Sequence, residues 1–221
     1  MNRNQKTFWY YPLLLVFVLW ALKLIEWAFD VRFTQLGIYP QRINGLIGII
    51  TAPLIHGSFK HLSSNSIPVF LLLSALIYFY PKLSLKVLIW SWLFSGLGVW
   101  VGGRFAWHIG ISGVIYALAA FLFFAGIISK NRRLSVISLL VVFVYGGMIW
   151  GILPNDPNVS WEAHLFGFVT GVLLAYWYAY EIKEIDKKEL PKVIEDFSEY
   201  NTSAGDVNIH YEINEHKDKP S

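Results

Sequence analysis

Six long apolar runs constrain this chain more than any other feature of its sequence. An α-helix needs about 20 apolar residues to cross about 30 Å of hydrocarbon, and every run has that length. Charged residues make up only 15% of the chain, against 55% hydrophobic residues, a balance typical of integral membrane proteins. We therefore predict an all-α membrane protein with six transmembrane helices, at residues 8–29, 62–80, 83–101, 109–129, 134–153 and 161–180.

The first run could in principle be a signal peptide. It is about 22 residues long, lacks a small-residue cleavage site, and carries Trp9 and Trp27 near its ends, where aromatic residues favour the membrane interface. It is expected to be a retained helix.

The positions of Lys and Arg predict the orientation of the helices, because positive charge collects in cytoplasmic loops. One side holds four such residues, Arg32, Arg42, Lys60 and Arg104. The other holds Arg3, Lys6, Lys82, Lys86, Lys130, Arg132, Arg133, Lys183, Lys187 and Lys188. Both termini are thus expected in the cytoplasm, in a multi-pass protein of the bacterial cytoplasmic membrane. Ser112 and His164 then both lie about three residues into inward-running helices, roughly 5 Å from the outer surface.

Two segments fall outside the spans. The first outer loop, residues 30–60, contains an apolar stretch at 43–55 that is too short to span and is expected to be interfacial or re-entrant. Residues 181–221 form a polar tail with 11 of the 15 acidic residues, and we expect a solvated cytoplasmic appendage beside a catalytic domain at 1–180. The net charge of +3 follows membrane topology, so no nucleic-acid partner is expected.

Several chemistries are not supported by the residues present. The chain has no cysteine, which excludes disulfides and thiolate chemistry. No Asp lies in a predicted span. His56 and His61 are five residues apart, which on a helix would place them about 140° from each other, so a zinc-binding pair is not formed. We predict neither a metal nor a cofactor. Lys23 and Glu26 are interpreted as an ion pair near the interface.

Neutral polar residues remain as the candidates for chemistry. Ser112 lies in Gly110-Ile111-Ser112-Gly113, and Tyr116 follows one turn later on the same face. His164 shares its face with Gly167 and Gly171, a Gly-x-x-x-Gly pattern that permits close helix approach. These glycines are expected to press against a small-residue stripe at Gly113, Ala117 and Ala120, which brings the imidazole to the hydroxyl. Such a pair is a minimal acyl-transfer apparatus.

The sequence also supplies hydrogen-bond donors for this chemistry. His61 and Asn65 are spaced i,i+4, so both project from one helix face at the outer end of the second span. Donors placed where an oxyanion develops are what acyl transfer requires. Taken singly, each motif is also typical of a structural role: a packing interface, a buried histidine, a helix N-terminal turn, or polar residues bonded to loop backbone.

In combination these residues resemble the rhomboid family of intramembrane serine proteases. The matching elements are His56-x4-His61-x3-Asn65, Gly110-x-Ser112-Gly113 with Tyr116, and Ala163-His164 with Gly167-x3-Gly171. They follow the order of the family, and the likeness covers roughly residues 8–180. The resemblance implies a six-helix rhomboid-like bundle, Ser112 as nucleophile and His164 as general base. It also implies that Tyr116 stacks on His164, that Asn65, His61 and the Ser112 N–H form an oxyanion hole, and that His56 supports the first loop.

One departure from the family concerns the first outer loop. Many bacterial members carry a Trp-Arg pair there, whereas this chain has Tyr39-Pro40-Gln41-Arg42. Arg42 is the residue available to anchor the loop.

The expected activity is hydrolysis of peptide bonds in or beside transmembrane segments of other membrane proteins. Substrates would enter from the lipid bilayer, past the fifth span and residues 154–160. No carboxylate is expected to orient the base, so Tyr116 and a backbone partner must do so. The main alternative is a catalytically silent rhomboid-like protein that binds transmembrane helices as a chaperone or adaptor. A transporter would require charges at mid-span or duplicated broken helices. The oligomeric state and the role of the tail stay open.

Overall fold

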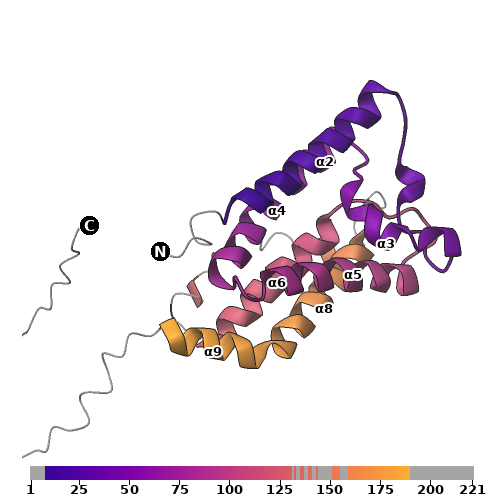
Figure 1. The fold of residues 1–221 in the computed structure, drawn as a ribbon. Coiled ribbons are helices and arrows are strands. Elements are labelled where there is room, and N and C mark those ends of the chain that lie inside the picture. The colour runs from indigo at the N-terminus through magenta and orange to yellow at the C-terminus, as the bar shows by residue number, and fades with distance from the viewer. Residues whose placement is uncertain are drawn as a thin grey trace, which may run out of the picture. The chain divides into compact units, whose positions relative to one another are not determined.

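The structure is a computed structural model that describes residues 8–130, 132, 135–136, 139–140, 143, 151–154 and 159–189. Helices dominate this part of the chain (Figure 1). The longer helices are α2 (Tyr10–Ala28), α4 (Phe59–Phe79), α5 (Ser84–Gly102), α6 (Ser112–Ser129), α8 (Trp161–Trp177) and α9 (Ala179–Glu189). Short helices between α2 and α4 are η1 (Thr34–Leu36), η2 (Ile43–Gly45), α3 (Gly48–Thr51) and η3 (Ala52–Leu54).

Helix α6 lies at the centre of the described bundle. It is apolar on every side, as a helix buried among others must be, and it contacts α4, α5, α8 and α9. Leu118 and Phe121 on this helix are fully buried in the main hydrophobic core. α8 lies along α6, with the most extensive contact of any described helix pair (Figure 1). The central position of α6 fixes the residue at its start relative to its neighbours.

The lengths of the helices agree with a membrane protein. α2, α4, α5 and α6 are each long and apolar enough to cross a bilayer, and the pair formed by α8 and residues 179–185 passes the same test as one bent span. The described residues thus hold four candidate spans, or five with the bent pair. The predicted span at 134–153 lies largely outside the described residues, so the count of six stays a prediction.

Several predicted helix boundaries were wrong, because local backbone contacts set the ends of helices. α6 begins at Ser112 and not at 109, and α4 begins at Phe59 rather than at 62, where the Ser58 side chain accepts a hydrogen bond from the His61 N–H. α8 ends at Trp177, and α9 leaves it at an angle of 63°.

The polar segment expected from residue 181 begins as the helix α9. Its Ile182 is fully buried in the main core, and α9 contacts α6. Backbone contacts group the chain through Glu189 into one compact unit and place Leu190–Ser221 in a second. Residues 190–221 lie outside the described part of the chain.

The first loop folds into short helical turns between α2 and α4. The apolar stretch Ile43–Leu54 is too short to span a membrane, and Ile43 and Ile50 are exposed. The Arg42 guanidinium lies 4.7 Å from the centre of the Tyr39 ring. The Trp100 indole N–H on α5 donates to the Arg42 carbonyl at 3.0 Å. Arg42 thus attaches the loop to α5 through its backbone.

Candidate active site

Ser112 is the first residue of α6, directly after a turn that only glycine forms easily. Gly110 has φ of +110°, a conformation that side chains rarely adopt. Its N–H donates to the Ala52 carbonyl of the first loop at 2.9 Å. This turn ends the loop and starts the helix, so the Ser112 hydroxyl and its backbone N–H lie at the N-terminus of α6, where backbone N–H groups have no partner within the helix.

His164 lies in the first turns of α8, and two contacts fix its ring. The ring stacks on Tyr116 of α6, with centres 4.2 Å apart and planes 10° from parallel. His164 Nδ1 is 2.8 Å from the Gly151 carbonyl oxygen. Because a carbonyl can only accept, Nδ1 carries the proton and Nε2 keeps its lone pair. This is the tautomer that a general base needs.

Close packing of α6 against α8 places the side chains at the starts of the two helices near one another. A Cβ atom added at Gly167 would collide with the Gly113 carbonyl oxygen, and one at Gly171 would collide with the Ala117 carbonyl oxygen and lie 2.8 Å from the Ala120 Cβ. The approach of the two helices along their small residues, expected from the Gly-x-x-x-Gly pattern, is therefore observed.

Ser112 and His164 are each about nine-tenths buried. The Ser112 hydroxyl and the His164 ring form no hydrogen bond with each other in this structure. Catalytic hydrogen bonds are commonly long without substrate and shorten when it binds. The neighbouring groups bring the two side chains to the same end of the α6–α8 pair.

His61 and Asn65 of α4 lie against the turn that precedes Ser112. A Cβ atom at Gly110 would be 3.0 Å from His61 Nε2 and 3.8 Å from Asn65 Nδ2. Asn65 Nδ2 is buried and has no hydrogen-bond partner among the described residues. A buried donor without a partner is energetically costly unless a bound group accepts its hydrogen bond. The structure thus brings the predicted donors to the turn that immediately precedes Ser112.

His56 is placed beside this group, in the loop before α4. Its ring is almost completely buried, packs edge-on against His61 at 5.1 Å, and has no hydrogen-bond partner on either nitrogen within the described residues. Burial, then the nearby His61 and Lys23, lower the pKa of His56 to about 3. His56 is therefore neutral at physiological pH.

The ion pair predicted between Lys23 and Glu26 is present, at 3.0 Å. The pair also forms hydrogen bonds to the first loop. Lys23 Nζ also donates to the His56 carbonyl at 2.9 Å, and Glu26 accepts from the Phe33 N–H at 2.7 Å. The pair therefore ties α2 to both ends of the first loop.

Sequence reasoning missed three groups near the dyad. No carboxylate was expected to orient the base, and His164 Nδ1 bonds instead to the Gly151 carbonyl. What the sequence reading overlooked is that Glu162 lies buried in the first turn of α8, two residues before His164. Its partner is Arg104, 58 residues away, and no sequence pattern links the two. The Gly151 carbonyl and the His108 ring were also missed. Among the described residues, no hydrogen bond or ion pair joins Glu162 to the His164 ring, which stacks on Tyr116 and bonds to the Gly151 carbonyl.

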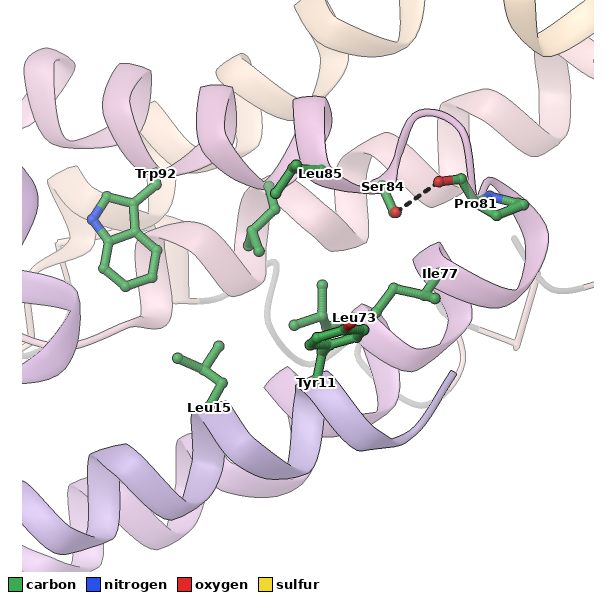
Figure 2. Close-up of a pocket in the computed structure, with 9 residues that line it drawn as sticks. Tyr11, Leu15, Leu73, Ile77, Pro81, Ser84, Leu85 and Trp92 are labelled. Carbon is green, nitrogen blue, oxygen red and sulfur yellow. Dashed lines mark hydrogen bonds between the residues drawn. The ribbon is translucent and has the colours of Figure 1, made fainter. Parts of the chain in front are cut away.

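A groove of about 580 Å³ lies between α2, α4 and α5, away from this site. Figure 2 shows its apolar lining, which includes Leu15, Leu73 and Trp92, and the hydrogen bond from Ser84 to the Pro81 carbonyl. Leu73 is 12 residues beyond His61 on α4, roughly 18 Å along the helix. The groove contains none of the candidate catalytic residues.

Known proteins are similar to most of this chain. The family model described as Rhomboid domain matches residues 44–181. Uncharacterized proteins of Mycobacterium tuberculosis and Mycobacterium bovis are each 36% identical over 174 residues, which cover 73% of this chain and 71% of theirs. A Bacillus subtilis protein provisionally named a rhomboid protease, YdcA, is 31% identical over 135 residues, 58% of this chain and 65% of its own.

Proposed function

Because this chain belongs to the rhomboid family, a family of multi-pass membrane proteins, we propose that it is a serine endopeptidase that cleaves transmembrane segments of other proteins. The observation that carries the proposal is the arrangement around His164. Its Nδ1 is bonded to the Gly151 carbonyl and its face is stacked on Tyr116, which leaves Nε2 available on the helix that lies against the start of α6.

The proposed reaction proceeds through an acyl-enzyme. His164 Nε2 removes the proton from the Ser112 hydroxyl as its oxygen attacks the scissile carbonyl carbon. The resulting oxyanion accepts hydrogen bonds from Asn65, His61 and the Ser112 N–H. His164 then protonates the amine that leaves as the peptide bond breaks. Water repeats the sequence on the ester, releasing the carboxylic acid and restoring Ser112.

The base in this scheme has no carboxylate partner. A backbone carbonyl holds the tautomer but carries no full charge to stabilise the imidazolium that forms during attack. Turnover is therefore expected to be slow relative to soluble enzymes with a Ser-His-Asp triad. Substrates with small or helix-breaking residues near the cut are favoured, since the helix must unwind to expose its peptide bond.

The proposed location is the bacterial cytoplasmic membrane, with the site on the outer side. This orientation is supported by the distribution of Lys and Arg among the loops. The end of α4 remote from His61 and Asn65 is followed by Lys82 and Lys86, as a cytoplasmic loop requires.

Replacement of the dyad tests the proposal. Ser112→Ala and His164→Ala should each abolish cleavage of a transmembrane substrate reconstituted in the same liposomes, and the double variant should be no worse than either single variant, because the two groups act as one unit. A fluorophosphonate should label the unsubstituted protein at Ser112. Specific cleavage by purified Ser112→Ala protein would refute the protease, and binding of the substrate without cleavage or labelling in the unsubstituted protein would identify the silent alternative.

A further inference from the structure

Polar side chains join the loop that leads into Ser112 to the first turn of α8. Arg104 Nε lies 3.5 Å from Glu162 Oε1, and the Arg104 backbone N–H donates to the same oxygen at 3.4 Å. Arg104 Nη2 donates to the Val159 carbonyl at 2.8 Å. One arginine thus holds both a side chain of α8 and the backbone just before it.

His108 makes a second connection between the same segments. Its Nε2 lies 3.0 Å from the Arg104 carbonyl, which can only accept, so Nε2 carries the proton. Nδ1 then accepts from the Ser160 hydroxyl at 2.6 Å. Ser160 is the N-cap of α8, and its oxygen accepts in turn from the Ala163 N–H at 3.3 Å. A neutral His108 satisfies every group in this chain of hydrogen bonds.

The first loop joins at the same residue. The N–H of His108 donates to the Ile38 carbonyl at 2.8 Å, and the N–H of Ile38 donates to the His108 carbonyl at 2.9 Å. Three segments that are distant in the sequence therefore meet at His108, four residues before Ser112.

Stability alone does not explain this arrangement. Glu162 is 2% exposed, and its second carboxylate oxygen has no hydrogen-bond partner among the described residues. Burying an ion pair commonly costs about as much in desolvation as it returns in attraction, so such pairs are weak stabilisers. What a directional pair can do is hold two segments in one relative position.

Gly167 and Gly171 set how closely α8 approaches α6. The polar contacts at the start of α8 add directional bonds to the loop before Ser112. Since a displacement of about 1 Å can cost about 100-fold in rate, the axial position of His164 must be held closely.

We propose that Arg104, His108 and Glu162 are positioning residues that clamp the loop before Ser112 to the first turn of α8 and so set the axial position of His164 relative to Ser112. The effect of this clamp on the cleavage rate rests on the proposed function. Its effect on the position of α8 relative to the loop does not. None of these three residues is proposed to contact the substrate.

Substitutions that keep shape separate positioning from folding. Glu162→Gln retains an oxygen for the Arg104 N–H but removes the charge, and Ser160→Ala removes the partner of His108 while Ser160→Thr keeps it. We expect kcat to fall by about 10-fold to 100-fold in Glu162→Gln and in Ser160→Ala, with KM within about twofold and near wild-type kcat in Ser160→Thr. Glu26→Gln is the matched control, because it removes a buried carboxylate paired with Lys23 on α2, and its kcat should be unchanged.

A distance measurement tests the clamp without relying on enzyme activity. The chain has no cysteine, so spin labels can be placed on introduced cysteines at Phe105 in the loop and Leu173 on α8, which are 69% and 62% exposed. The distance distribution should be narrow in the otherwise unsubstituted protein and in Glu26→Gln, and broader or shifted in Glu162→Gln and Ser160→Ala. Unchanged distributions in both clamp variants, or wild-type kcat in both, would overturn the clamp. Failure of the unsubstituted protein to label with fluorophosphonate would instead overturn the proposed function.

Discussion

The buried amide of Asn65 is the single side chain whose removal tells most about the chemistry. Its Nδ2 is adjacent to the turn before Ser112 and has no described partner. Asn65→Ala should therefore lower kcat by about 10-fold to 1000-fold, the usual effect of losing one oxyanion donor, with little change in KM. Steady-state cleavage in proteoliposomes gives both constants, with exposed Ser64→Ala on the same helix as control. A loss confined to KM would make Asn65 a substrate-binding residue.

Protonation of His56 should destabilise the fold. Its pKa in the folded protein is lowered to about 3, whereas an unfolded histidine titrates near 6.5. Because the unfolded state binds the proton more readily, stability is complete above about pH 6.5 and is lost as the pH falls from there towards 3. Burial also lowers the pKa of His108, which acts in the same direction.

Thermal unfolding in detergent between pH 7.5 and 4.5 measures this effect. The melting temperature should fall with pH, and the fall should be smaller in His56→Phe, which has an aromatic ring but no titrating group. His210→Phe, in the polar tail, is the control. An equal fall in His56→Phe and in the unsubstituted protein would show that folding does not lower the pKa of His56.

At the scale of helices, the contact of Gly171 with the Ala117 carbonyl determines how α8 meets α6. A β-branched side chain at 171 must push the helices apart, since even a Cβ atom collides there. Gly171→Val should cost about 1–3 kcal/mol in stability and reduce cleavage strongly, because His164 moves with α8. Leu173→Val on the exposed face of α8 is the control. Wild-type melting temperature and cleavage in Gly171→Val would contradict the packing.

Helices and helix contacts were predictable where they depend on hydrophobicity and side-chain size. The apolar runs located α2, α4, α5 and α6 to within a few residues, and the glycines at 167 and 171 indicated their contact with α6. Helix ends were not predictable from hydropathy. The apolar pattern continues through Tyr178, whereas the bend after Trp177 depends on backbone geometry.

In the candidate site, too, some groups were predictable from the sequence and others were not. Ser112, His164, Tyr116, His61 and Asn65 are brought together as their motifs indicated, although their roles stay predictions. Glu162 was overlooked because a carboxylate at a helix start ordinarily faces solvent, and its burial depends on Arg104, 58 residues away. The Gly151 carbonyl has no sequence signal, since every residue carries one.

For the whole molecule, we predict that the catalytic body ends at Glu189. Deletion of residues 190–221 should leave cleavage of a model substrate largely intact, because His164 lies 13 residues before the end of α8, roughly 20 Å from it. Deletion from residue 179 should instead unfold the protein, because it removes Ile182 from the core. Melting temperature and cleavage at matched concentration distinguish the two. A loss above about tenfold in the shorter deletion, with the body folded, would couple residues 190–221 to the site.

The bond from His164 to the Gly151 carbonyl has a genetic consequence. When a carboxylate side chain orients a catalytic histidine, one codon change deletes the partner and leaves a crippled enzyme from which intermediate activities can evolve. Here the partner is main chain, so no codon change deletes it, and any larger residue at position 151 would collide with Tyr116. A lineage that abandons the activity is therefore expected to change Ser112, His164 or the stacked Tyr116, because the carbonyl partner itself offers no side chain to lose.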